Sequence, residues 1–351
     1  MATLSPLINL PEELCCRIAH HLGAKDAASL RLSCKRLHAA ATESLFSFVR
    51  LYPNDRSVNR YNSILSAPHL NRLVKRVELN TVDPDAEWEV EGFGAEFEDD
   101  ALDAFKKFPD FAGLTGVTLR FSPNVSSDQD ITEWPEDIAF RRSILQGFFN
   151  TLAQPSASRI TDVCFNNLQN INDTQFMQSE VAVGLLSRLK ALRLYISTEL
   201  GTEDGIPSLD IVLPELHSFM HQLPSTWLQP TVKNLTTLVL YQDVYFGFFP
   251  KLDLRGLHFP NLKTLSLGNY VFSHRWQLDW ISSHLDTLEN LYLQECPVLY
   301  FVKAPSTNSP LDPEGYPIRS AIDSLPATEN EQHSNVHRMN DLTFWITSRI
   351  T

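Results

Sequence analysis

A six-residue pattern, L-x-x-L-x-L, recurs along the second half of this 351-residue chain. Its clear copies begin at Leu189, Leu235, Leu262 and Leu288. A weaker copy begins at Leu216, and degenerate copies begin at Val74, Leu114 and Ile160. Copies from Leu189 onward are 19 to 27 residues apart, and the earlier ones are 29 to 46 residues apart. A repeat of this length predicts an array of stacked units, because a single unit cannot bury its own leucines.

The last two leucines of each copy are separated by one residue. Side chains two residues apart point to the same face of a strand, so each copy is expected to form a strand with a leucine face. Between the strands, residues 101–108, 141–152 and 276–285 have the apolar spacing of helices. We therefore predict an α/β fold, an irregular solenoid with parallel strands on the concave face and helices and loops on the convex face.

The residues that alternate with these leucines are expected to line the concave face. A solenoid face of this kind is an extended surface for binding proteins. The candidate target-binding residues are Arg193, Tyr195, Val239, Tyr241, Ser266, Tyr292 and Gln294. A second interpretation stays open, in which the repeats are only a scaffold and the loops bind the target.

Residues 7–46 have a different organisation, with the apolar spacing of short helices. Pro11 suits the first turn of a helix because it has no N–H group to leave unpaired. Leu14, Ile18 and Leu22 recur every four residues and predict one apolar stripe. Gly23 is expected to end this helix in a left-handed cap.

Two further short helices are predicted in the same region. Asp26 is expected to cap the second, which carries Leu30 and Leu32, and Ser33 is expected to cap the third. The inner face of the third would hold Leu37, Ala41 and Leu45. Three short helices bury little core, so apolar side chains are left that need a partner.

The order and spacing of these residues resemble the F-box over residues 7 to about 50. The matching motif reads Leu10-Pro11-x-Glu13-Leu14, then Ile18, Leu22 and Leu30, then Leu32-Ser33-Cys34-Lys35-Arg36-Leu37. Many F-boxes have a tryptophan late in the third helix, where this chain has Phe46. The resemblance implies binding to the Skp adaptor of Skp–cullin–F-box ubiquitin ligases. The adaptor-binding positions that it implies are Leu7, Leu10, Pro11, Leu14, Ile18, Leu22, Leu30 and Leu32.

Composition excludes several function classes. The formal net charge of −13 argues against binding nucleic acid through its phosphates. No apolar run approaches the length of a membrane span, and no signal pattern stands at the N-terminus, so a cytoplasmic or nuclear location is expected. The five cysteines contain no C-x-x-C motif and are expected to be small buried or half-buried residues rather than metal ligands or disulfides.

The chain divides into four predicted parts. Residues 1–50 form the F-box and residues 65–303 the irregular leucine-rich repeats. Residues 304–338 are rich in proline and expected to be flexible, and residues 339–351 carry an apolar patch expected to cap the solenoid. The acidic stretch 83–103 is predicted to be a solvated insertion, with a site for a basic partner segment as the alternative.

No catalytic motif or cofactor-binding loop stands out in the sequence. We therefore expect a non-catalytic substrate-recognition subunit of a Skp–cullin–F-box ubiquitin ligase. The F-box would bind the adaptor, and through it the cullin, while the repeats would recruit an unknown target protein. The alternative is a free-standing leucine-rich-repeat interaction scaffold that acts without a ligase. The two differ in whether the chain binds the adaptor.

Overall fold

The computed structural model describes residues 10–83, 99–123, 136–203, 206–209, 213–299 and 311–317. Within them, eight parallel strands form one sheet in the order β1-β2-β3-β4-β5-β8-β9-β10. The strand bounds are Phe48–Leu51 (β1), Arg76–Asn80 (β2), Gly116–Arg120 (β3), Asp162–Gln169 (β4), Ala191–Ser197 (β5), Thr237–Phe246 (β8), Thr264–Tyr270 (β9) and Asn290–Gln294 (β10). Strands β6 (Leu200–Glu203) and β7 (Ile206–Leu209) form a separate antiparallel pair.

The leucines of the repeat hold the sheet together. In register, Leu192 of β5 lies beside Leu238 of β8, which lies beside Leu265 of β9. These three side chains are fully buried, as are Val117 and Val163 in the more degenerate copies. The predicted parallel sheet is therefore confirmed. The face of the sheet that packs against the helices is continuously apolar.

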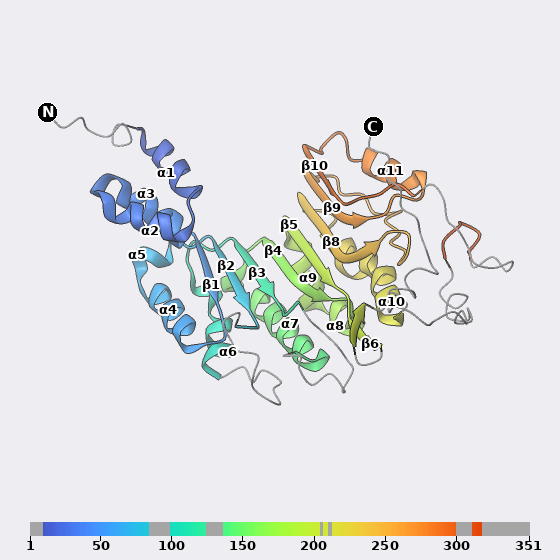
Figure 1. Ribbon diagram of the computed structural model, residues 1–351, viewed down its shortest axis with the longest axis horizontal. Coiled ribbons are helices and arrows are strands. Elements are labelled where there is room, and N and C mark those ends of the chain that lie inside the picture. Colours follow the sequence, from blue (N-terminus) through green and yellow to red (C-terminus); the bar gives the residue numbers. More distant parts are fainter. Residues whose placement is uncertain are drawn as a thin grey trace.

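Helices alternate with the strands along the chain and pack against this apolar face of the sheet. Their bounds are α4 (Asp55–Ser66), α5 (Pro68–Asn71), α6 (Asp99–Lys106), α7 (Ile138–Ala153), α8 (Thr174–Met177), α9 (Glu180–Arg188), α10 (Pro214–Leu223) and α11 (Arg275–Ser282). Figure 1 shows the sheet as an arc, with α4, α6, α7 and α9 along its outer side. Aromatic side chains such as Phe148, Phe165 and Trp227 fill the space between helices and sheet.

The predicted helices at 101–108, 141–152 and 276–285 correspond to α6, α7 and α11. The strand predicted from the weak repeat copy at Leu216 is wrong, because these residues form helix α10. Pro214 and Glu215 stand in the first turn, where proline and an acidic residue favour a helix. Leu216, Phe219, Met220 and Leu223 are buried at helical spacing.

Three helices precede the sheet, as predicted: α1 (Glu12–His20), α2 (Ala24–Ser33) and α3 (Lys35–Phe46). Their caps differ from the prediction. Gly23 has extended backbone angles and caps the start of α2, so it does not end α1 in a left-handed turn. Asp26 lies inside the first turn of α2, and Cys34 stands at the cap of α3 in place of Ser33.

Two predicted segments fall mostly outside the described residues. These are the acidic stretch, of which residues 84–98 are not described, and the terminal segment 339–351. Of the proline-rich segment, residues 311–317 are described and lie against the solenoid, with Tyr316 buried.

Candidate functional site

The first N-terminal helix, α1, has one buried side and one exposed side that carries apolar residues. Cys15 and Ala19 of α1 are buried in a small core with Leu37 and Ala40 of α3. Leu14 and Ile18 of α1 are not part of this core and are 41% and 37% exposed. Of the predicted stripe, Leu14 and Ile18 therefore lie on the exposed side of α1, whereas Leu22 follows the helix, which ends at His20.

The remaining predicted adaptor-binding residues differ in exposure. Leu32 of α2 is 87% exposed, the highest value among the large apolar residues that the structure describes. Pro11 is exposed, whereas Leu10, Leu22 and Leu30 are half-buried. The Leu10 carbonyl accepts a hydrogen bond of 2.5 Å from the Arg36 guanidinium, which fixes the chain where it enters α1. Leu7 lies outside the described residues.

A second candidate surface is the concave face of the sheet. The register places Arg193 of β5 beside Val239, Val239 beside Ser266, and Ser266 beside Tyr292. In the next row, Tyr195, Tyr241, Gly268 and Gln294 follow one another in the same way. All seven predicted target-binding residues are therefore on one face, in two adjacent rows.

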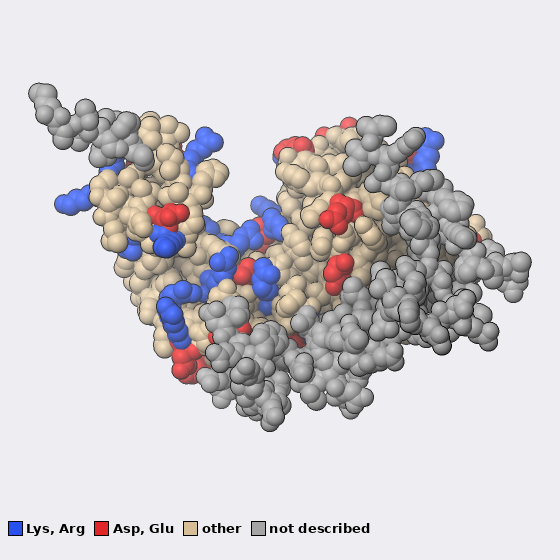
Figure 2. Space-filling view, in the orientation of Figure 1, with Lys and Arg blue, Asp and Glu red and all other residues tan. Residues whose placement is uncertain are grey.

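The same face carries a network of charged side chains over strands β1 to β5. Asp162 pairs with the guanidinium groups of Arg76, at 2.5 Å, and Arg193. Glu78 pairs with those of Arg50, at 3.3 Å, and Arg120, at 3.4 Å. Four guanidinium groups against two carboxylates leave a net charge of +2, in a chain whose net charge is −13. Figure 2 shows Lys and Arg gathered in the hollow between the N-terminal helices and the other end of the sheet.

Two glycines on this face let a neighbouring side chain lie flat across the sheet. A Cβ atom on Gly116 would stand 3.1 Å from the Arg76 guanidinium carbon. Because glycine has no such atom, Arg76 has room to reach Asp162. A Cβ atom on Gly268 would overlap the Tyr241 ring. Tyr241 thus leans over Gly268, with its ring centroid 5.9 Å from that of Tyr195.

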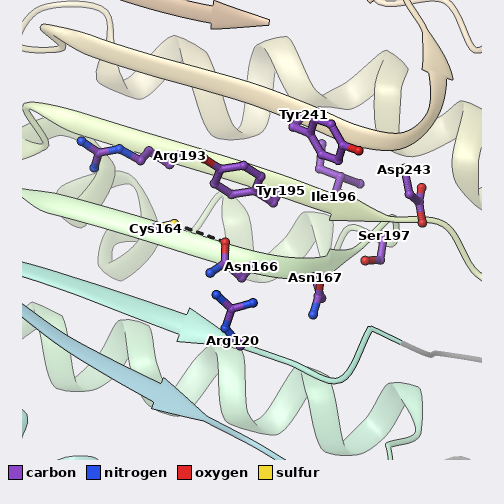
Figure 3. A pocket seen from close by; sticks show the side chains of 10 residues that line it. All are labelled: Arg120, Cys164, Asn166, Asn167, Arg193, Tyr195, Ile196, Ser197, Tyr241 and Asp243. Carbon is purple, nitrogen blue, oxygen red and sulfur yellow. Dashed lines mark hydrogen bonds between the residues drawn. The ribbon is translucent and has the colours of Figure 1, made fainter. Parts of the chain in front are cut away.

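A hollow of about 440 Å³ lies where the charges meet the tyrosines. Figure 3 shows the Tyr195 and Tyr241 rings on one side of it and Arg120 and Asn166 on the other. It is lined by Arg120, Cys164, Asn166, Asn167, Arg193, Tyr195, Ile196, Ser197, Tyr241 and Asp243. Of the predicted target-binding residues, three line this hollow, and Tyr292 and Gln294 lie away from it on the terminal strand.

Burial shifts the pKa of two side chains that line the hollow. Burial raises the pKa of the Cys164 thiol to about 11, although Arg193 and Arg76 oppose the shift. Its thiol is therefore protonated at neutral pH and a poor nucleophile. Burial also raises the pKa of Asp243, whose carboxylate accepts hydrogen bonds from the Thr198 backbone N–H and hydroxyl. Across the described parts of the chain, no group of three or more His, Cys, Asp or Glu side chains is arranged to hold a metal ion.

Residues 7–51 match the family described as F-box-like. They form an F-box-like domain. The match covers the three helices and extends to Leu51, the last residue of β1. No curated protein matches the chain. A search of the described helices for one long and apolar enough to cross a membrane finds no candidate.

The F-box-like domain continues directly into the sheet. The Ser47 carbonyl accepts hydrogen bonds from the backbone N–H groups of Lys75 and Arg76 at the start of β2. Phe46 packs against the core of the sheet, and the Arg31 guanidinium of α2 lies 5.5 Å above the Phe46 ring. Phe46, noted in the sequence as the late aromatic of the third helix, thus joins the helices to the first strand.

The arginines and acids of the charge network were not predicted from the sequence. Arg76, Glu78, Arg120 and Asp162 alternate with the buried residues of the degenerate copies, as Arg193 does in its own copy. Applying the same alternation to those copies would have placed them on the concave face. The pairing of Arg76 with Asp162 has no such signal, since it crosses an intervening strand.

Proposed function

We propose that this chain is the substrate-recognition subunit of a Skp–cullin–F-box ubiquitin ligase. The F-box-like domain binds a Skp-type adaptor, and through it the cullin, and the concave face of the sheet recruits a target protein. The observation that carries the proposal is an F-box-like domain on which Leu14, Ile18 and Leu32 are exposed. In this role the chain itself is not catalytic and acts in the cytoplasm, the nucleus or both.

An adaptor would cover the apolar side chains that the domain leaves in water. Burying an exposed leucine or isoleucine fully contributes about 1.5–3 kcal/mol. Leu14, Ile18 and Leu32, together with the exposed Pro11, offer several such contributions on one small domain. A few well-buried anchors supply most of the free energy of a typical protein interface. These residues are therefore the anchors that we assign to the adaptor.

The target is assigned to the concave face. Tyrosine and arginine dominate the energetics of protein interfaces, and this face presents Tyr195, Tyr241 and Tyr292 together with four arginines. A target held there would stand near the ubiquitin-charged enzyme, and the gain in rate would come from proximity. Val239, Ser266 and Gln294 complete the proposed contact surface.

The test is co-purification of the full chain with a Skp-type adaptor. We expect a stoichiometric complex for the wild type and none for the Leu10→Ala/Pro11→Ala double variant. The sheet should stay folded in that variant, since neither residue contributes to the main core. Retention of the adaptor by the double variant would count heavily against the proposal.

The second candidate is a free-standing interaction scaffold in which the three helices cap the solenoid. The continuity of α3 with β1 favours it, because Phe46 packs against the core of the sheet and the Ser47 carbonyl accepts hydrogen bonds from the start of β2. It predicts no adaptor complex and a loss of solubility when residues 1–50 are removed. Adaptor binding that depends on Leu10 and Pro11 would decide against this candidate.

A further inference from the structure

Residues Leu311–Pro317, with the sequence LDPEGYP, form a small closed turn. Leu311 pairs with Pro317, and the backbone N–H of Asp312 donates to the Tyr316 carbonyl at 2.7 Å. The Asp312 carboxylate accepts hydrogen bonds of 2.9 Å from the backbone N–H groups of Glu314 and Tyr316. Gly315 has φ +89°, a conformation that side chains other than glycine rarely adopt. The turn is thus shaped by its own hydrogen bonds.

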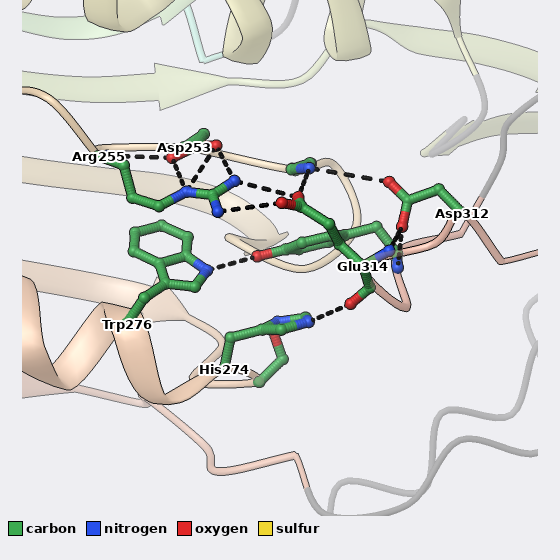
Figure 4. Close-up of polar contacts among 9 residues, drawn as sticks. Asp253, Arg255, His274, Trp276, Asp312 and Glu314 are labelled. Carbon is green, nitrogen blue, oxygen red and sulfur yellow. Dashed lines mark hydrogen bonds and ion pairs between the residues drawn. The ribbon is translucent and has the colours of Figure 1, made fainter.

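The turn presents Glu314 to two cations of the solenoid (Figure 4). Its carboxylate receives two hydrogen bonds of 3.0 Å from the Arg255 guanidinium and one of 2.8 Å from the Lys251 ammonium. Asp253 holds the other side of the same guanidinium, at 2.5 Å. Arg255 is therefore already oriented for a carboxylate, and its fork geometry suits bidentate recognition.

Tyr316 is the second anchor and is 1% exposed. Its ring stacks on that of His274, with ring centroids 4.2 Å apart. The Lys251 ammonium lies over the Tyr316 ring, 4.0 Å from its centroid. The Trp276 indole N–H donates to the Tyr316 hydroxyl at 3.1 Å. Tyr316 is therefore held by stacking, a cation–π contact and a hydrogen bond at once.

The described contacts between the turn and the solenoid are made through side chains. Its backbone hydrogen bonds stay within the turn, apart from the Glu314 carbonyl, which contacts the His274 ring nitrogen at 2.7 Å. The turn is no member of the sheet order, and β9 and α11 have their own hydrogen bonds without it. A pre-shaped turn held by a carboxylate and a tyrosine resembles a bound peptide more than a strand of the fold.

We propose that Lys251, Arg255, His274 and Trp276 form an exchangeable peptide-binding cleft, which residues 311–317 occupy in cis. The partner that it fits is an acidic segment of another protein with a carboxylate two residues before a tyrosine and a small residue between them. Charge supports this choice of partner. Lys251, Arg255 and Asp253 give the cleft a net charge of +1. The carboxylates of Asp312 and Glu314 in the turn bring the combined net charge to −1. The inference does not depend on adaptor binding.

Tethering determines how the exchange is observed. A ligand linked to its own site by a short chain has an effective concentration on the order of millimolar. A free peptide must therefore reach that concentration to displace the turn of the wild type. A variant whose own turn lacks the tyrosine anchor should bind the free peptide at much lower concentration.

The probe is a fluorescent peptide with the sequence of residues 309–319, titrated into the full chain and followed by anisotropy. We expect the Tyr316→Ala chain to bind it at least about tenfold more tightly than the wild type does. Arg255→Glu in the Tyr316→Ala chain should abolish binding, and a peptide with Glu314→Gln should bind weakly. Tyr245→Ala, which removes an exposed tyrosine elsewhere, should leave the wild-type behaviour unchanged.

A turn that only caps the solenoid would give a different result. The folded Tyr316→Ala chain would then bind no peptide, and this outcome would overturn the proposal. If that variant does not fold, the wild type is mixed with millimolar peptide and hydrogen exchange of residues 311–317 is measured. Faster exchange in the presence of peptide supports displacement, and unchanged exchange rules it out.

Discussion

Arg141 and Glu136 form an ion pair inside the protein, at the end of the sheet where β3 and β4 leave the core. The Arg141 Nε donates to Glu136 at 2.8 Å, and both side chains are almost fully buried. Arg141 also donates to the carbonyls of Ser122, at 2.5 Å, and Asn167, at 3.1 Å. Burial lowers the pKa of Arg141, an effect that Glu136 opposes. The pair thus joins the start of α7 to two strand ends.

We expect Arg141→Met to cost about 3–5 kcal/mol of unfolding free energy, because it leaves the Glu136 carboxylate buried without its partner. The Glu136→Leu/Arg141→Met double variant should recover part of this loss, since no charge remains unpaired. Urea unfolding of the two variants and the wild type measures both values. A loss below about 1 kcal/mol for the single variant would contradict the buried pair.

His284 predicts a dependence of stability on pH. Its ring is buried. The Nε2 atom accepts a hydrogen bond of 3.1 Å from the Phe259 backbone N–H, and the Nδ1 atom donates one of 2.9 Å to the Trp280 carbonyl. Burial lowers the pKa of His284 below its ordinary value of 6.5, and the stacked His258 acts in the same direction. The folded state therefore holds His284 neutral.

The unfolded chain takes up this proton first as the pH falls, so the stabilisation is complete above about pH 6.5 and is lost progressively below it. Unfolding free energies measured between about pH 8 and about pH 5 should fall less steeply for His284→Gln than for the wild type. Equal pH dependence in both chains would exclude a role for His284.

The elements with a strict leucine pattern could be predicted from the sequence, and those with mixed patterns could not. Strands β5, β8, β9 and β10 coincide with the clear copies, because two leucines at a spacing of two leave one face to bury. At Leu216 the apolar residues also fit a period of 3.6, and Pro214 and Glu215 decide for the helix. The predicted helix caps were wrong for a related reason, since more than one residue near each helix boundary could serve as the cap.

The candidate site was predictable in part for the same physical reason. Alternation along a strand is local, so the concave rows of Arg193 and Tyr195 follow from the sequence. The contacts between strands do not. Arg76 meets Asp162 across 86 residues of chain, and only the structure shows that Gly116 leaves room for it. The turn at 311–317 was likewise hidden within a proline-rich segment.

The close approach of Gly268 on β9 to the Tyr241 ring on β8 predicts an energetic coupling between the two residues. We expect Gly268→Ala to cost about 1–3 kcal/mol, because its Cβ overlaps the Tyr241 ring and pushes it off the sheet. In a Tyr241→Ala background the same change should cost much less, and the difference is a coupling energy. Urea unfolding of the four chains completes the cycle. Additive costs would show that the ring does not depend on the glycine.

The molecule as a whole has two unlike ends. Val49 and Leu51 of the first strand, β1, are buried, whereas Leu291 and Leu293 of the last strand, β10, are 44% and 48% exposed. Solenoids generally need a cap at each end. The predicted cap at residues 339–351 lies outside the described residues and stays a prediction.

The exposed end gives a direct test of how open β10 is. We expect Leu291→Glu/Leu293→Glu to change the unfolding free energy by no more than about 1 kcal/mol, as surface substitutions do. The same pair of changes at Leu265 and Leu267 of β9, which are buried, should unfold the sheet. Thermal unfolding compares the two variants. A severe loss in the β10 variant would indicate that another part of the protein covers this strand.

The measurement that bears most directly on the proposed function is a calorimetric titration of a Skp-type adaptor into the full chain. We predict saturable binding at one adaptor per chain, weakened at least about 100-fold by Leu14→Asp/Leu32→Asp. Leu285→Asp, at a leucine that is 66% exposed on the solenoid, should bind as the wild type does. Absence of binding by the folded wild type, or equal affinity in the Leu14/Leu32 variant, would contradict the account.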